Sequence, residues 1–406
     1  MSFWRGPSRG EQRPGPLFRR GRAGQRHAAF AAASLEPPRP FGPALDNIDI
    51  KSLLIEEDSP KIENVTYVAS YNWLDGAHPV ILVPGSPPAW TPPSEDTQLT
   101  PDSQDVFRDI NAARYAAYPM EPAIRSILAL EPDFDLQAVD VMGCGSTMGN
   151  LLRLVSSQGR PFRFDVDLIG ETVFFVRHES SPAELIKDLR GYGHTFPEMY
   201  TTWNSDVGQS CSHQRIVQYE FGGLRFLIRS ETDGYVKEPT SSRSSSTTKS
   251  LSSTSDMLGT MSMGNVGPST GQKLLLKIQG DKIPQDRIFD IKTRSEHVVF
   301  DLNEIIPRLW INQTPRFLLA YHSYGLFRNP SVKDVRQDVL AWQDSNSTTL
   351  GRFHALIKRI LDVVRDSVNQ QIEVSWDGQG PLLITEQIGE GRRVLPPDLY
   401  CHWENI

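Results

Sequence analysis

Two short apolar segments of this sequence run into charged residues that are spaced two apart. The first segment leads to Glu231 and Asp233, and the second leads to Asp290 and Lys292. Side chains two residues apart on a β-strand point to the same face of the sheet. If the two strands lie side by side, three carboxylates and one ammonium gather in one small patch. The chain is therefore expected to fold as a sheet around this patch.

The residue types of the patch suit the chemistry of a divalent cation. Mg²⁺ and Mn²⁺ prefer oxygen ligands, keep several waters, and take further ligands from a substrate phosphate. A bound cation lowers the pKa of its water, and a neighbouring lysine can orient or help to deprotonate that water. The same spacing also occurs on solvated strand faces, so a plain charged surface remains the alternative interpretation. Both halves of the patch follow apolar segments and end in turn residues. The sequence is therefore compatible with either interpretation, a metal-dependent phosphodiesterase site or a plain charged surface.

A long Ser/Thr-rich stretch separates the two halves of the patch. Between Thr240 and Ser255, 13 of 16 residues are Ser or Thr, and such a composition buries too little apolar surface to fold. We therefore expect residues 237–272 to be a disordered insertion within one domain. Residues 1–45 are rich in Arg, Gly and Pro, which predicts a disordered arm before a domain that covers 46–406.

The net charge of −7 is unevenly distributed along the chain. Residues 1–27 contain seven arginines and one acid, so this arm carries +6 and the remainder carries −13. An acidic body is not typical of a protein that binds nucleic acid over a large surface without sequence preference. The arm has two interpretations: it grips single-stranded RNA through phosphate contacts and stacking, or it is a solvated tail or poor mitochondrial presequence.

The cysteines and the hydropathy of the sequence indicate in which cellular compartment the protein is expected. The three cysteines, Cys144, Cys211 and Cys401, are scattered and odd in number, which favours a reducing environment over a disulfide framework or a zinc site. No stretch of 18 apolar residues occurs, so we expect no membrane partner. The first residues lack the apolar core of a secretion signal, and the expected location is nuclear or cytoplasmic.

The remaining pattern indicates an α+β protein without internal repeats. Its expected strands are 64–74, 79–84, 138–142, the two strands of 162–176, the hairpin 216–228, 274–278, 287–293, 316–321, 371–376 and 382–385. Its expected helices are 123–129, 150–154 and 353–368, the last with a continuous apolar face. The segment 302–312 is also amphipathic, although Pro307 would interrupt a helix there. We expect one large domain built of mixed β-sheets with flanking helices.

Other residues invite a functional interpretation but have a structural alternative. The turn 143–147 between a strand and a helix could cradle a phosphate, or it is a plain connection, since it lacks the lysine of a P-loop. His194 is a candidate ligand or an oriented core histidine. His213 lies near Cys211, but no second pair stands at the ligand spacing of zinc.

Taken in order, several segments resemble the DXO-like decapping and 5′-to-3′ exoribonuclease family, a branch of the PD-(D/E)XK nuclease superfamily, in a remote fungal-type form. The resemblance spans roughly residues 60–400. Its motifs are Glu231-x-Asp233, the segment Asp290-Ile291-Lys292-Thr293, the strand 170–176, the segment 191–198, and Trp310-x-x-Gln313 followed by Pro315-Arg316.

The resemblance implies a PD-(D/E)XK-like core, a site for Mg²⁺ or Mn²⁺, and a substrate class. By analogy, the metals would be held by Glu179, Asp233, Asp290 and the carbonyl of Ile291. Glu231 would act through water, and Lys292 and Gln313 would face the nucleophile or the scissile phosphate. The implied partners are RNA 5′ ends and a 5′-3′ exoribonuclease.

Two departures keep a second function open. The family has an arginine that grips RNA phosphate in the segment matching 143–147, where this chain has none, and Asp290 stands where the family has Glu. The alternative is therefore a catalytically silent RNA-end-binding or scaffold protein of the same fold. Prenyl diphosphate synthesis is excluded, because the Asp-Asp-x-x-Asp motif is missing and the expected strands do not suit an all-helical fold.

Overall fold

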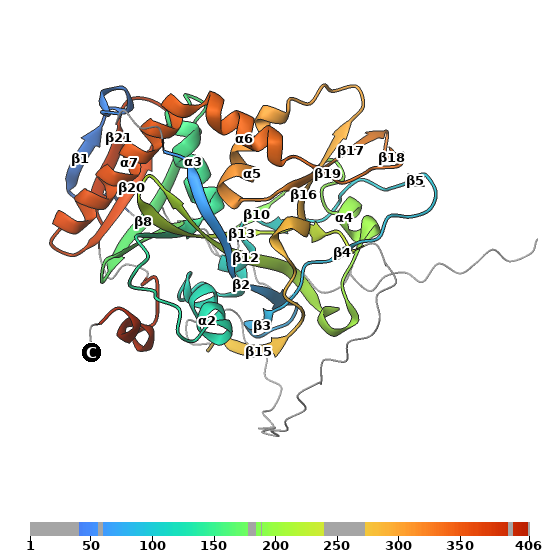
Figure 1. The fold of residues 1–406 in the computed structure, drawn as a ribbon, viewed down its shortest axis with the longest axis horizontal. Coiled ribbons are helices and arrows are strands. Elements are labelled where there is room, and N and C mark those ends of the chain that lie inside the picture. Colours follow the sequence, from blue (N-terminus) through green and yellow to red (C-terminus); the bar gives the residue numbers. More distant parts are fainter. Residues whose placement is uncertain are drawn as a thin grey trace, which may run out of the picture.

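The computed structural model describes residues 40–55, 60–177, 184–187, 189–238, 273–388 and 393–404. Within these ranges the chain forms two large mixed sheets with helices around them (Figure 1). The 11-stranded sheet contains, in spatial order, β1 (Ala44–Ile48), β21 (Leu382–Glu386), β20 (Gln371–Trp376), β8 (Phe162–Ile169), β9 (Thr172–Arg177), β7 (Val141–Cys144), β13 (Leu224–Glu231), β12 (Ser210–Phe221), β2 (Ile62–Leu74), β3 (Val80–Pro84) and β15 (Leu275–Gln279).

The second sheet is built from shorter strands and lies beside the first. In spatial order it contains β11 (Thr201–Thr202), β4 (Ala89–Trp90), β14 (Gly234–Tyr235), β16 (Ile288–Ser295), β17 (Arg316–Ser323), β18 (Leu326–Phe327) and β5 (Thr97–Gln98), while β19 (Lys333–Asp334) pairs with β17. A separate short pair joins β6 (Val106–Phe107) to β10 (Leu185–Ile186).

The helices of the described ranges lie around these sheets. They are α1 (Ile110–Arg114), α2 (Glu121–Leu130), α3 (Gly145–Val155), α4 (Thr195–Tyr200), α5 (Ile306–Asn312), α6 (Arg336–Ser345) and α7 (Ser347–Asp366), with short 3-10 turns η3 (Ile50–Ser52), η4 (Ser205–Val207), η5 (Gln285–Arg287), η6 (Leu302–Glu304) and η7 (Pro397–His402). None of them combines the length and the hydrophobicity that a membrane crossing requires.

The middle of the large sheet is buried on both faces, which explains the apolar sequence of its interior strand β9. On β9, Val173 and Phe175 belong to the core formed with α3 and α7. Phe174 and Val176 point the other way and belong to the core formed with α2. Figure 1 shows α3 and α7 together above the sheet and α2 below it. Strands covered on both faces lose the polar alternation of a half-exposed strand.

The predicted fold class is confirmed: the chain is an α+β protein with large mixed sheets and flanking helices in one domain. Several predicted elements appear with small shifts, among them the hairpin of β12 and β13, which turns at Gly222-Gly223. Residues 1–39 and 239–272, which hold most of the predicted arm and insertion, lie outside the described residues. Strand β1 begins at Ala44, so the predicted domain start at residue 46 falls within it.

Pro307 has a different role from the one that the sequence suggests. A helix over 302–312 would be interrupted by this proline, because proline lacks an N–H and clashes with the preceding turn. In the structure the segment forms the separate turn η6, and α5 begins only at Ile306. Pro307 therefore lies in the first turn of α5, where a missing N–H has no cost.

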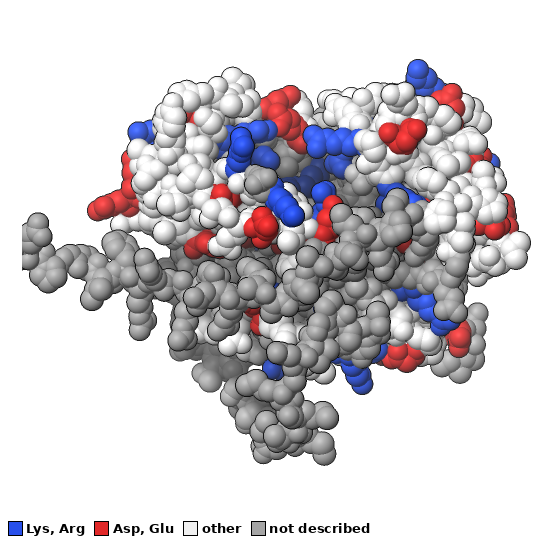
Figure 2. Space-filling model, turned by 180° about the vertical axis from the view of Figure 1, so that it is seen from behind, with Lys and Arg blue, Asp and Glu red and all other residues white. Residues whose placement is uncertain are grey.

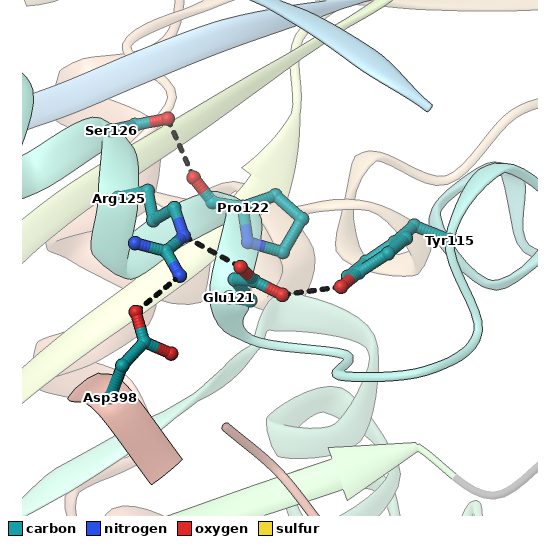
Figure 3. A network of polar contacts seen from close by, with 6 residues as sticks. All are labelled: Tyr115, Glu121, Pro122, Arg125, Ser126 and Asp398. Carbon is teal, nitrogen blue, oxygen red and sulfur yellow. Dashed lines mark hydrogen bonds and ion pairs between the residues drawn. The ribbon is translucent and has the colours of Figure 1, made fainter. Parts of the chain in front are cut away.

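A buried carboxylate ties the carboxyl-terminal turn η7 to α2 (Figure 3). Glu121 accepts a hydrogen bond from the hydroxyl of Tyr115 and one from Arg125 Nε at 2.6 Å. Arg125 Nη2 in turn donates to Asp398 Oδ2 at 2.8 Å. Glu121 is only 3% exposed, so its charge relies on these two donors for the solvation that water does not provide.

Glu121→Gln is expected to lower the free energy of unfolding by about 1.5 kcal/mol, because a hydrogen-bonded charge is replaced by a neutral amide beside Arg125. The measurement is urea denaturation followed by circular dichroism. Asp398→Asn serves as the matched control: its side chain is 62% exposed, and exposed pairs contribute less than about 1 kcal/mol. Equal effects of the two substitutions would contradict this account of Glu121.

Candidate functional site

The chain passes from one sheet to the other at the Glu-x-Asp motif. Glu231 is the last residue of β13 in the large sheet, and Gly234 is the first residue of β14 in the second sheet. Gly234 lies so close to Phe289 that a Cβ would clash with its ring, and the carbonyl of Pro88 leaves little room beside it. This close approach requires a glycine, and it brings Asp233 next to β16.

Asp233 and Asp290 therefore lie together. Strand β14 pairs with β16, with Gly234 opposite Phe289. The N–H of Ile291 donates a hydrogen bond to Asp233 Oδ2 at 2.6 Å. Glu231 reaches the same place from the end of β13, an interior strand of the other sheet, and its charge interacts with both Asp233 and Asp290. The structure thus brings the three predicted carboxylates together.

The predicted arrangement of the strands is nevertheless wrong. The sequence suggested that the two motifs lie on neighbouring strands of one sheet. In the structure β13 pairs with β12 and β7, whereas β16 pairs with β14 and β17. The carboxylates meet across the boundary between two sheets, because Asp233 belongs to the connection and not to a strand.

Arg308 of α5 completes the group of charges. Its Nη2 lies 2.8 Å from Asp290 Oδ2 in an ion pair. Asp290 is buried, so this ion pair takes the place of the water that its carboxylate lacks. Glu231, Asp233, Asp290 and Arg308 are called the carboxylate cluster below.

The carboxylates of the cluster repel one another inside the protein. The Glu231 side chain is exposed to the solvent of a cavity, but the protein atoms around the cavity keep it from bulk water. This partial desolvation, together with the charges of Asp233, Asp109 and Asp290, raises the pKa of Glu231 to about 8. Burial and the charge of Asp290 raise the pKa of Asp233 to about 7, although Arg308 and the N–H of Ile291 oppose the rise. When all three carboxylates are ionised, the cluster carries more negative charge than Arg308 balances, and in the metal-free protein protons offset part of it.

The stability of the metal-free protein is expected to fall as the pH rises from about 5 to 8. The folded protein holds protons on Glu231 and Asp233 that the unfolded chain releases near its ordinary pKa of about 4. Between these values the native state binds more protons, so increasing pH favours unfolding. Urea denaturation in a chelating buffer at several pH values tests this. Glu231→Gln should show a shallower pH dependence, and an unchanged slope would contradict the assignment.

Lys292 lies on β16, two residues after Asp290, but is not among the residues that line the cavity. It is exposed. Partial burial and the charges of Arg294 and Arg308 lower the pKa of its ammonium, while Glu304 acts in the opposite direction. The charged groups that act on its pKa are therefore Arg294, Arg308 and Glu304.

Three further residues were assigned a role by the resemblance, and none of them is found in the cavity wall of the described structure. Gln313 ends α5 with φ of 52°, and its side-chain amide donates back to the carbonyl of Trp310 in the same helix. It does not line the cavity, and neither does Ile291. Glu179 lies outside the described residues. Of the implied ligands, the structure therefore places Asp233 and Asp290 at the cavity, together with Glu231.

A cavity of about 1310 Å³ opens beside the cluster. Many of the side chains in its wall are charged. The basic residues are Arg108, Arg114, Arg153, Arg177, Arg229 and Arg308, and the acidic ones are Asp75, Asp102, Asp105, Asp109, Glu198, Glu231, Asp233 and Asp290. Figure 2 shows Lys and Arg side chains gathered around a hollow in one face of the molecule, with Asp and Glu side chains among them.

Sequence reasoning missed these arginines. No arginine occurs in the segment 143–147, but α3 starts there and carries Arg153 to the cavity wall. Arg177 ends β9, and Arg229 lies two residues before Glu231 on β13. Only the last had a local signal, because a residue two positions away on a strand shares a face with Glu231.

The residues present suit a divalent cation in their chemistry. Three carboxylates supply hard oxygen donors, and together with Arg308 they leave an excess of two negative charges, which one divalent cation would balance. As the side chains stand, no group of three His, Cys, Asp or Glu within the described ranges has the geometry of a metal site. Arg308 is paired with one of the three carboxylates, Asp290.

The sequence of this chain matches the model of one protein family. Residues 58–377 match the family described as a domain of unknown function, DUF8563. The chain belongs to this family. No curated protein matches the sequence.

Solved structures share the fold of this DUF8563 chain. Rai1 of Scheffersomyces stipitis, in complex with (3′-NADP)+ and a calcium ion, has a TM-score of 0.55 and 11% identity, covering 91% of this chain and 99% of that chain. Rai1 of S. pombe has a TM-score of 0.54 and 9% identity, over 84% and 99% of the two chains. Rai1 of Candida albicans, in complex with pU5-Mn²⁺, has a TM-score of 0.54 and 9% identity, over 88% and 98%. The predicted resemblance is thus confirmed as a Rai1-like fold.

Proposed function

We propose that this protein is a metal-dependent hydrolase of phosphodiester or pyrophosphate bonds at RNA 5′ ends, of the decapping or 5′-3′ exoribonuclease type. One observation carries the proposal: Glu231, Asp233 and Asp290 converge from two sheets on a large cavity whose wall also holds six arginines. A cation-binding group next to a phosphate-binding surface is what hydrolysis of a phosphate ester requires.

Each part of the cavity has a role in this proposal. Asp233 and Asp290 would hold Mg²⁺ or Mn²⁺, which when bound neutralises charge on the phosphoryl oxygens and lowers the pKa of a water. Glu231, which opens onto the cavity, would act through water and accept its proton. Arg153 and Arg177 would bind the phosphates of the RNA, and Trp203, also in the wall, would stack on a base.

The fold supports an RNA substrate and a divalent cation. The similar Rai1 of C. albicans is in complex with pU5-Mn²⁺, and that of S. stipitis is in complex with (3′-NADP)+ and a calcium ion. The resemblance also gives catalytic roles to Lys292 and Gln313. Because neither lines the cavity, we assign proton transfer to Glu231 and treat Lys292 as a cation that stands beside Arg308.

A catalytically silent RNA-end-binding protein is the second candidate. It is favoured by the ion pair of Arg308 with Asp290. A guanidinium neutralises part of the cluster without any metal, and phosphate binding by the cavity arginines would remain.

The two candidates differ in an experiment on the full-length chain. RNAs with a cap, a triphosphate or a monophosphate at the 5′ end are incubated with Mn²⁺, Mg²⁺ or a chelator, and binding and products are measured together. Metal-dependent products that vanish with chelator support the hydrolase. Binding without products under any metal supports the silent protein, and the lack of both ends the RNA proposal.

A further inference from the structure

Arg308 is held in place by a well-anchored helix. The residues that follow it on α5, Leu309, Trp310 and Ile311, are buried in the cores beside the cavity. Trp310 Nε1 also donates a hydrogen bond to Gln343 Oε1 of α6 at 2.7 Å. The helix fixes the backbone of Arg308, and from there its side chain, 47% exposed, reaches Asp290.

The guanidinium of Arg308 interacts electrostatically with all three carboxylates of the cluster. It pairs with Asp290 at 2.8 Å, and the negative charges of Asp290, Asp233 and Glu231 all raise the pKa of its guanidinium. Arginine stays protonated under all ordinary conditions. Its charge is therefore permanent, unlike that of a metal ion, which can dissociate.

Counting charges shows what this cation does to the site. Three ionised carboxylates alone would need more than one divalent cation to become neutral, and Arg308 reduces the excess to two negative charges. A single divalent cation then gives neutrality, whereas two would leave a positive excess. Arg308 also holds the Asp290 oxygen that a metal would otherwise take.

We propose that Arg308 is a built-in cation of the carboxylate cluster, which limits the site to one divalent cation and competes with that cation for Asp290. This inference rests on the proposed function only for the presence of a cation site. It predicts that removal of the guanidinium makes the cluster a better metal site, which is the opposite of the effect expected if Arg308 only supports the structure.

The test is calorimetric titration of Mn²⁺ into the full-length chain after treatment with a chelator. The wild-type protein should bind one Mn²⁺. Arg308→Gln should bind Mn²⁺ about tenfold more tightly or bind a second ion, because a nearby positive charge is removed. Arg308→Lys keeps the charge and should stay near the wild type. Arg294→Gln is the matched control, since Arg294 pairs with Glu304 at 2.7 Å away from the cavity wall.

Thermal melting gives a second readout that does not depend on activity. Without metal, Arg308→Gln should melt at a lower temperature than the wild type, because three carboxylates then face one another without a cation. Addition of Mn²⁺ should raise the melting temperature of Arg308→Gln by more than that of the wild type.

The outcomes separate this inference from the proposed function. Mn²⁺ binding by the wild type that Arg308→Gln leaves unchanged or weakens overturns the inference alone. Binding only by Arg308→Gln supports the inference and overturns the metal-dependent hydrolase. If neither protein binds Mn²⁺ while both melt cooperatively, the inference and the hydrolase proposal both fail.

Discussion

Asp233→Asn is expected to reduce Mn²⁺-dependent hydrolysis of RNA 5′ ends by about a thousandfold, which corresponds to about 4 kcal/mol of transition-state stabilisation. Asp233 lies where the chain crosses between the two sheets and shares the cavity with Glu231 and Asp290. The substitution removes a negative charge that would hold the cation. Initial rates with saturating RNA over a range of Mn²⁺ concentrations measure the effect.

The fold should survive this substitution. The oxygen of the asparagine side chain can still accept the hydrogen bond that the N–H of Ile291 donates to Asp233. Loss of one of several like charges also relieves repulsion in the metal-free protein. Asp334→Asn is the matched control, because Asp334 is paired with Arg336 on the surface. A variant Asp233→Asn that folds and keeps most of the activity would exclude the carboxylate cluster as the catalytic centre.

Local patterns predicted the central part of the large sheet well. The hairpin of β12 and β13 follows from two apolar runs around Gly222-Gly223, both with positive φ. The strands β8 and β9 follow from a similar signal around Gly170, which also has positive φ. Glycine takes such conformations without cost, so turns of this kind are visible from neighbouring residues alone.

The second sheet was much harder to predict. Strands such as β4, β14 and β18 have only two residues each, too few for an alternating pattern to be recognised. Their pairing is decided by tertiary contacts, for example between Gly234 and Phe289. The change of sheet between Glu231 and Gly234 therefore left no mark in the sequence, and the motifs were assigned to one sheet.

The same limit explains what was missed in the candidate site. A pair such as Glu231 and Asp233 is detectable because its members are close in the sequence. Arg153, Arg177 and Arg308 come from α3, β9 and α5, and only the fold collects them around one cavity. Their absence from the segment 143–147 suggested a lost phosphate contact, but residues distant in the sequence can supply the same chemistry.

Simultaneous replacement of Arg153 and Arg177 by Gln is expected to weaken RNA binding roughly 25-fold at about 0.1 M salt. Both arginines line the cavity. Each phosphate contact on a single strand changes the logarithm of affinity by about 0.7 per decade of salt. The loss of two contacts therefore makes the salt dependence about 1.4 shallower. Between about 1 M salt, where these contacts contribute little, and about 0.1 M, this difference amounts to a factor of roughly 25. Fluorescence anisotropy with a short 5′-labelled RNA at several salt concentrations measures both quantities.

The control is the double variant Arg336→Gln with Arg359→Gln. It removes the same charge from surface pairs with Asp334 and Asp46 and should have little effect. Equal losses in the two double variants would mean that RNA responds to net charge, and the cavity would no longer be assigned as its binding site.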